Sequence, residues 1–112
     1  MTDQQKRILE LARLIRKHNR WTTYADIGEL VYGTRSGART VGNTMRDEGR
    51  DESAHRILLK GGRVSPQVRG ALGSPEEAIK RLTREGIWDM TRNCARGDRF
   101  INAAQLRELE RQ

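Results

Sequence analysis

Two short helical patterns joined by a glycine turn constrain this chain more than any other feature. Thr22 or Thr23 can cap a first helix, and Gly33 is typical of a residue that ends one. The apolar stripe between them has helical spacing and comprises Tyr24, Ile27, Leu30 and Val31. Ser36 can cap a second helix with the inward residues Ala38, Val41 and Met45. Its opposite face carries Arg39, Asn43 and Arg46. Residues 22–46 therefore predict a helix-turn-helix.

The segments on either side of this unit predict a leading helix and a β hairpin. In residues 1–19, Asp3 can cap a helix with the apolar stripe Ile8, Leu11, Ala12 and Ile15. After Gly49 the pattern becomes that of a strand over 56–59, a glycine turn over 60–63 and a returning strand over 64–65. A hairpin that follows a helix-turn-helix is a wing, which we expect within residues 53–70.

Residues 74–112 predict two more helices and a second small hairpin. Ser74 and Pro75 are a strong helix start, and Gly86 ends that helix. A strand around Trp88 and another at 100–101 could pair about the turn 96–98, and Asn102 would cap a last helix. The sequence thus predicts one domain over residues 1–112, mostly α with a small β content, arranged as a winged helix-turn-helix.

The charge of the chain favours a polyanionic partner. It has 22 Lys and Arg against 15 Asp and Glu, a formal net charge of +7, and residues 35–69 carry eight basic and four acidic groups. Such an excess points to nucleic acid. No apolar run approaches the about 20 residues of a spanning helix, and the N-terminus lacks a signal peptide's apolar region. We therefore expect no membrane contact and a cytoplasmic protein, nucleoid-associated in a bacterium or nuclear in a eukaryote.

Catalytic and metal-binding patterns are weak in this sequence. The single cysteine, Cys94, cannot form an intrachain disulfide, and with His18 and His55 it makes no zinc spacing. His55 lies two residues from Ser53, but nothing marks an orienting acid or an oxyanion hole. We expect no metal, no cofactor and no enzymatic activity, with an enzyme using Cys94 or His55 as a minor alternative.

A resemblance to a known family rests on residues 20–70. The pattern is Tyr24, then Gly33, then Ala38-Arg39-x-Val41-Gly42-x-x-Met45, then Ala54-His55-Arg56-Ile57 and Gly62. It resembles the DNA-binding domain of the O6-alkylguanine-DNA alkyltransferases, and most of all the alkyltransferase-like proteins, which lack the acceptor cysteine. Ala54 occupies the acceptor position and Ser53 stands where the family has proline. A methyl side chain has no lone pair for an alkyl group, so alkyl transfer at this site is excluded.

The resemblance implies roles for individual residues. Arg39 would enter through the minor groove and fill the gap left by an extruded nucleotide, and Tyr24 would press on the neighbouring phosphate. The implied DNA-binding residues are Tyr24, Arg35, Arg39, Asn43 and Arg46. The implied lesion pocket comprises Met45, Ala54, His55, Arg56, Ile57, Val64 and Arg69, with the segment 64–69 as its lid.

The function that this resemblance implies is recognition of DNA damage without repair. A monomer would bind double-stranded DNA, flip an alkylated guanine into its pocket and flag it for nucleotide excision repair proteins. The alternative is a winged-helix protein of the transcription-factor type that reads the major groove through Arg39, Asn43 and Arg46 without lesion specificity.

Overall fold

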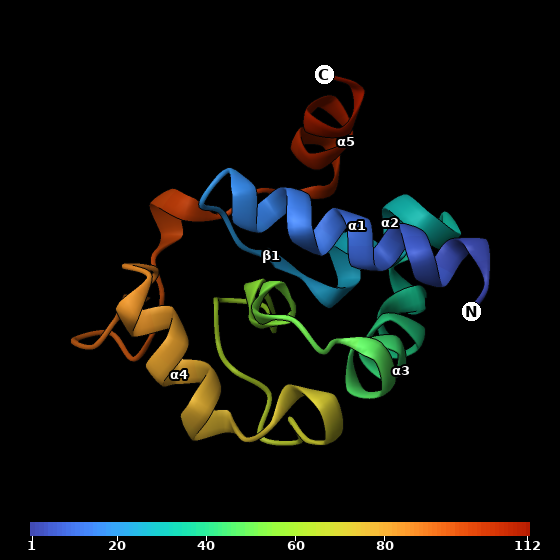
Figure 1. The fold of residues 1–112 in the computed structure, drawn as a ribbon. Helices are drawn as coiled ribbons and strands as arrows, with labels where there is room; N and C mark the ends of the chain where they lie inside the picture. The colour runs from blue at the N-terminus through green and yellow to red at the C-terminus, as the bar shows by residue number, and fades with distance from the viewer.

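The computed structural model describes residues 1–112, apart from the side chain of Glu52. The described chain is mostly helical with a small strand content, as predicted (Figure 1). Its α helices are α1 (Asp3–Lys17), α2 (Tyr24–Tyr32), α3 (Ala38–Glu48), α4 (Pro75–Arg84) and α5 (Ala103–Arg111). Its strands are β1 (Thr22–Thr23), β2 (Ile57–Leu58), β3 (Trp88–Asp89) and β4 (Cys94–Ala95). Its 3-10 helices are η1 (Arg35–Gly37), η2 (Glu52–Arg56), η3 (Gly70–Leu72) and η4 (Gly97–Arg99).

Side-chain caps fix most helix starts where the sequence predicted them. The hydroxyl of Thr23 accepts from the Asp26 N–H at the start of α2, and Gly33 ends that helix at φ 79°. Ser74 caps α4 and Asn102 caps α5 in the same manner. These predictions are confirmed because a cap depends only on residues within one turn of it.

The starts of α1 and α3 differ from the predictions. Thr2, one residue before Asp3, caps α1 through a reciprocal pair of hydrogen bonds with Gln5, and the helix ends at Lys17. Ser36 lies inside η1, whose own cap is Thr34, so α3 begins only at Ala38. The 3-10 turn brings Gly37 against α2, and this tertiary contact decides the start of α3 in place of a side-chain cap.

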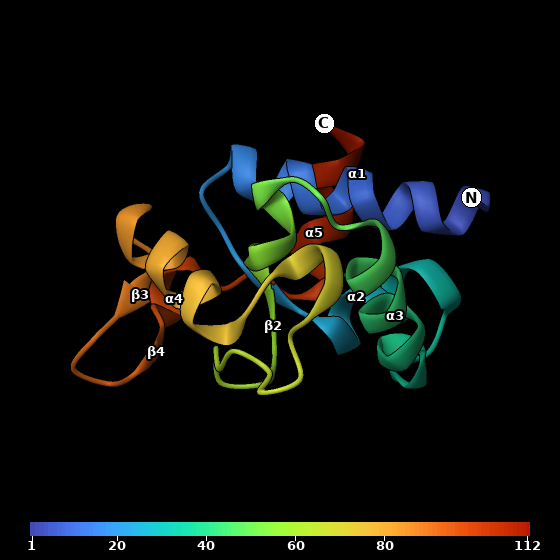
Figure 2. The same cartoon turned by 60° about the horizontal axis from the view of Figure 1, so that its bottom comes forward.

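The hydrophobic core has two parts. The first comprises the inward faces of α1, α2, α3 and α5, and the predicted stripe of α1 and the α3 residues Val41 and Met45 are buried in it. The second lies under α4 and the β3–β4 hairpin and contains Trp21, Leu82 and Ile87. Figure 2 shows α3 and the hairpin at opposite ends of the molecule. None of the described helices is both long and apolar enough to cross a membrane.

The predicted wing hairpin is wrong in its partners. Ile57 and Leu58 pair in parallel with Thr22 and Thr23, far away in sequence. The return after the glycine turn is a single bridge between Leu59 and Arg63, and no strand forms at 64–65 in the described chain. One physical reason lies at Gly62, whose carbonyl accepts from the Ala95 N–H at 2.8 Å. This bond holds the turn against β4, so it cannot lengthen into a free hairpin.

The second predicted hairpin exists with a different partner strand. Trp88 and Asp89 pair antiparallel with Cys94 and Ala95. The connecting turn lies at 90–93, where the Asp89 carboxylate accepts from two backbone N–H groups. The predicted partner around Phe100 forms a parallel bridge with Trp21 instead, because Trp21 supplies an unpaired backbone edge between α1 and α2.

A buried arginine joins the two parts of the core. The Arg56 side chain is 2% exposed, and its guanidinium donates to the Arg20 carbonyl at 2.9 Å and to the Glu85 carboxylate at 3.1 Å. Arg20 follows α1 and Glu85 follows α4. The pair therefore ties the first part of the core to the second.

Replacing Arg56 with methionine is expected to lower the free energy of unfolding by about 2–3 kcal/mol, because the Arg20 carbonyl would lose its donor and Glu85 would lose its closest cation, keeping Arg16 at 3.3 Å. Urea unfolding measures this loss. The control is Arg13→Met, which breaks an exposed ion pair with Asp51 at 3.0 Å and should cost no more than about 1 kcal/mol. Equal losses in the two variants would contradict the linking role of Arg56.

Candidate nucleic-acid interface

The open face of α3 and the chain after β2 enclose a cavity of about 430 Å³. We call it the α3 cavity. Arg39, Asn43 and Arg46 line it from α3, at spacings that place them on one side of a helix. Its other lining residues are Tyr24, Ala38, Gly42, Leu59, Ser65, Gln67, Val68, Arg69 and Leu72. The structure thus brings together four of the five DNA-binding residues that the sequence singled out.

Close backbone packing between α2 and the start of α3 positions the near wall of this cavity. A Cβ atom added at Gly28 would lie 2.7 Å from the Ala38 nitrogen and 2.8 Å from the Gly37 carbonyl carbon. Only glycine permits this approach, which sets Tyr24 of α2 opposite Arg39 and Gly42 of α3. Gly42 lies beside the tyrosine ring, since a Cβ there would be in ordinary van der Waals contact with Tyr24 Cδ1, at 4.0 Å.

The far wall is the loop 65–72, which packs on the C-terminal part of α3. Gly70 has φ 65°, and a Cβ there would lie 2.7 Å from the Arg46 carbonyl oxygen. Leu72 is buried at the end of this loop, and Val68 packs against the first part of the core. Arg69, next to Gly70 in this loop, lines the α3 cavity. Val64 instead lines a different cavity with Trp88 and α4.

Tyr24 lines the α3 cavity and carries a neutral phenol. Burial raises the pKa of its phenol to about 12, because desolvation disfavours the phenolate. The group therefore remains a hydrogen-bond donor at every physiological pH, and a phosphate oxygen is an acceptor that suits it.

The three arginines of the predicted DNA-binding set differ in their partners. Arg46 donates to its neighbour Asp47 at 2.9 Å, and this hydrogen bond raises the pKa of Arg46 and lowers the pKa of Asp47. Arg35 lies outside the α3 cavity and forms ion pairs with Asp26 and Glu29 at 3.4 and 3.7 Å. Arg39 is exposed and has no ion pair with any described side chain. Of the three, Arg39 is the cation that a ligand can engage at no internal cost.

Most of the implied lesion-pocket residues lie elsewhere. Met45, Ala54 and Ile57 are 0%, 3% and 1% exposed and belong to the first part of the core. Ala54 and Met45 border a separate cavity of about 330 Å³ between α1 and the end of α3. His55 is buried, and the buried Arg56 makes the structural contacts described above. Of that set, Arg69 alone lines the α3 cavity among the described residues.

Ser65 and Gln67, which also line the α3 cavity, fall within the segment 64–69 that the resemblance gave as the lid, but neither was singled out as a site residue. The signal available for them was Pro66 followed by Gly70, which is typical of a loop that turns back over a neighbouring element.

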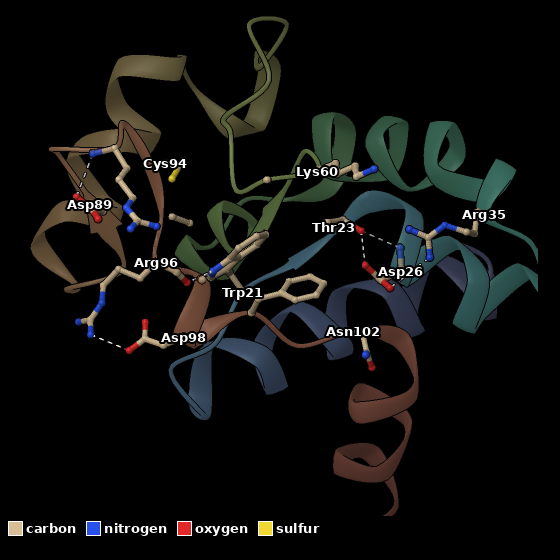
Figure 3. Close-up of a pocket in the computed structure, with 15 residues that line it drawn as sticks. Trp21, Thr23, Asp26, Arg35, Lys60, Asp89, Cys94, Arg96, Asp98 and Asn102 are labelled. Carbon is tan, nitrogen blue, oxygen red and sulfur yellow. Dashed lines mark hydrogen bonds and ion pairs between the residues drawn. The ribbon is translucent and has the colours of Figure 1, made fainter.

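The largest cavity, about 990 Å³, was also not predicted from the sequence. Figure 3 shows it between the β3–β4 hairpin, the turn at Lys60 and the first turns of α2 and α5. The rings of Trp21 and Phe100 both line it, with their centroids 4.9 Å apart. Residues from four separate segments meet here, so no local pattern could indicate it.

Comparisons of this chain with protein-family models, with curated proteins and with solved structures find no match. Within the described residues, no group of three or more His, Cys, Asp or Glu side chains could hold a metal ion. The geometry of the α3 cavity and the charge around it are therefore the observations from which a function can be argued.

Gly28→Ala tests the close packing that shapes the cavity. Helix propensity alone would stabilise the variant by about 1 kcal/mol, but the crowded Cβ should instead destabilise it by about 1–3 kcal/mol. Denaturant unfolding gives the sign. Gly97→Ala is the matched control, because a Cβ there meets nothing within 4 Å, and stabilisation of Gly28→Ala would contradict the close contact.

The raised pKa of Tyr24 predicts a loss of stability at high pH. The phenol of Tyr24 ionises near pH 10 in the unfolded chain and near pH 12 in the folded one. Its contribution to the free energy of unfolding is therefore complete below pH 10 and declines as the pH rises toward 12. At pH 11 the wild type should lose about 1.4 kcal/mol that Tyr24→Phe does not lose. Unfolding at pH 9 and pH 11 measures it, with Tyr32→Phe as the control. The same loss in Tyr24→Phe would refute the buried phenol.

Proposed function

We propose that this chain recognises damaged DNA without repairing it. It binds a duplex that contains O6-alkylguanine, rotates the modified nucleotide out through the minor groove and marks it for nucleotide excision repair. The observation that carries this proposal is the convergence of Tyr24, Arg39, Asn43, Arg46 and Arg69 on one cavity. Its volume of about 430 Å³ lies within the range of small-ligand sites, about 300–1,000 Å³.

Arg39 suits the role of the residue that replaces the extruded nucleotide. It is the second residue of α3, exposed, and has no ion pair among the described side chains. Flipping a nucleotide costs a few kcal/mol of stacking and pairing. A planar guanidinium can recover part of this cost by stacking between bases and donating to their edges.

Tyr24 suits the role of the phosphate contact that rotates the nucleotide. Its hydroxyl stays protonated, and its ring is half-buried between α2 and α3, next to Gly42. A ring held in this way can press on a backbone phosphate without losing much conformational entropy. Phosphate contacts of this type set the register of a protein on DNA.

The proposal includes no alkyl transfer. Ala54 supplies only a methyl group, and Cys94, the single thiol, lines the largest cavity and not the α3 cavity. A thiolate, the usual acceptor, is therefore absent from the described lining of the α3 cavity. Under this proposal the biological effect comes from a long-lived complex that excision repair proteins encounter.

The exposed face of α3 also supports a second candidate function. Arg39, Asn43 and Arg46 on one helix face could read base edges in the major groove, as in transcription factors of the helix-turn-helix class. Such a protein would be indifferent to alkylation of guanine.

Competition binding separates the two functions. The proposal predicts tighter binding to a duplex with one O6-methylguanine than to the matched guanine duplex, measured at a stated salt concentration because a chain of charge +7 binds any DNA at low salt. Arg39→Ala should weaken lesion binding by more than about 1 kcal/mol through loss of a charged contact. Arg107→Ala, which removes an exposed charge from α5, is the control.

Equal affinity of the wild type for both duplexes would refute lesion recognition and favour the second candidate. The mass of the intact protein after incubation with the lesion duplex should remain unchanged, since a transferred alkyl group would add its mass.

A further inference from the structure

The largest cavity borders the α3 cavity along one ridge. Thr23 and Lys60 line the largest cavity, and their neighbours along the chain, Tyr24 and Leu59, line the α3 cavity. At both places, consecutive residues of the chain line the two cavities, and these residue pairs form the ridge between them. A polymer bound in the α3 cavity would cross this ridge and enter the larger cavity, which we call the hairpin groove.

The cations of the hairpin groove divide into paired and unpaired ones. Arg35 pairs with Asp26, and Arg96 pairs with Asp98 at 2.9 Å. The third carboxylate of the lining, Asp89, accepts from the backbone N–H groups of Thr91 and Arg92.

Lys60 and the Arg92 side chain are the unpaired cations of the groove. Both are exposed, and neither has an ion pair with any described side chain. They come from different segments, Lys60 from the glycine turn after β2 and Arg92 from the turn of the β3–β4 hairpin. Two exposed cations that line one groove suit the phosphates of a strand that runs through it.

We propose that the hairpin groove binds the phosphate backbone of the DNA flanking the flipped nucleotide, with Lys60 and Arg92 as its phosphate contacts. This inference rests on the proposed function, because it assumes that DNA occupies the α3 cavity. The β3–β4 hairpin would then contact DNA as the wing of a winged helix does, although it follows α4 and not α3 in the chain. Phosphate contacts carry no sequence information, so the groove adds affinity to lesion and unmodified DNA alike.

Salt dependence tests the groove directly. Binding of the full chain to a duplex with one central O6-methylguanine, and to the matched guanine duplex, is measured over a range of salt concentrations. Each lost phosphate contact lowers the slope of log affinity against log salt by about 0.9, which is about eightfold in affinity at 0.1 M salt relative to 1 M. Lys60→Ala and Arg92→Ala should each show this change on both duplexes, and the double variant about twice the change in slope.

Three comparisons make the result decisive. Arg107→Ala should leave the salt slope nearly unchanged, and the lesion preference should persist in Lys60→Ala and Arg92→Ala. On duplexes shortened stepwise from one end, the effect of Arg92→Ala should disappear before that of Arg39→Ala, since the hairpin and α3 lie at opposite ends of the molecule (Figure 2).

The possible failures are distinguishable. If Arg39→Ala abolishes the lesion preference while Lys60→Ala and Arg92→Ala change the slope no more than Arg107→Ala does, the groove inference is overturned and the proposed function stands. If the wild type binds the lesion duplex and the guanine duplex equally, and Lys60→Ala and Arg92→Ala have the salt slope of the wild type, both the proposed function and the groove inference are overturned. Thermal unfolding of each variant confirms that these exposed substitutions leave the fold intact.

Discussion

The contact between Gly28 of α2 and the backbone at Gly37 and Ala38 is the constraint on which the candidate interface depends. A Cβ added at Gly28 would come within 3 Å of backbone atoms of Gly37 and Ala38, so α2 and the start of α3 can approach this closely only with glycine at position 28. Arg39 directly follows this crossing, and Tyr24 lies one helical turn before it. The size of the α3 cavity therefore follows from a backbone distance. Gly70 does the same for the opposite wall, where it lies against the Arg46 carbonyl.

The second constraint is electrostatic and acts on the whole molecule. Arg56 connects Arg20 and Glu85, and so fixes the segment that includes α4 and the hairpin relative to α1 and β1. Asp26 performs a related task nearby: its carboxylate accepts from the Ala103 N–H at 3.0 Å and attaches the start of α5 to α2. Both groups are buried polar side chains with several partners, and such networks specify one arrangement of the elements around them. The walls of the hairpin groove belong to elements that these two residues hold in place.

The sequence predicts the elements that local chemistry determines and misses those that distant partners determine. Ser74 and Asn102 start helices through hydrogen bonds with residues three positions away, so a short stretch of sequence is enough to predict where these helices begin. Ile57 pairs with Thr22, which is distant in sequence, and no local pattern indicates this strand partner. The candidate site divides in the same way. Arg39 and Asn43 share a helix face and share a cavity, whereas Ala54 has the small apolar character of a pocket wall and lies in the core. Periodicity indicates which face is buried, and the tertiary packing decides which cavity an exposed face borders.

The distribution of ion pairs explains why one arginine stands apart in the proposed mechanism. Inserting a charged side chain into a base stack removes water from it, and this cost grows if an internal ion pair must break first. Arg46 would have to break or weaken its ion pair with Asp47, and Arg35 already forms ion pairs with Asp26 and Glu29. Arg39, between them along the chain, has no such partner among the described side chains, so its whole interaction energy remains available to DNA. Among these three arginines, the carboxylates that neutralise Arg35 and Arg46 therefore favour Arg39 for the proposed role of replacing the extruded nucleotide, a distinction that net charge alone would not make.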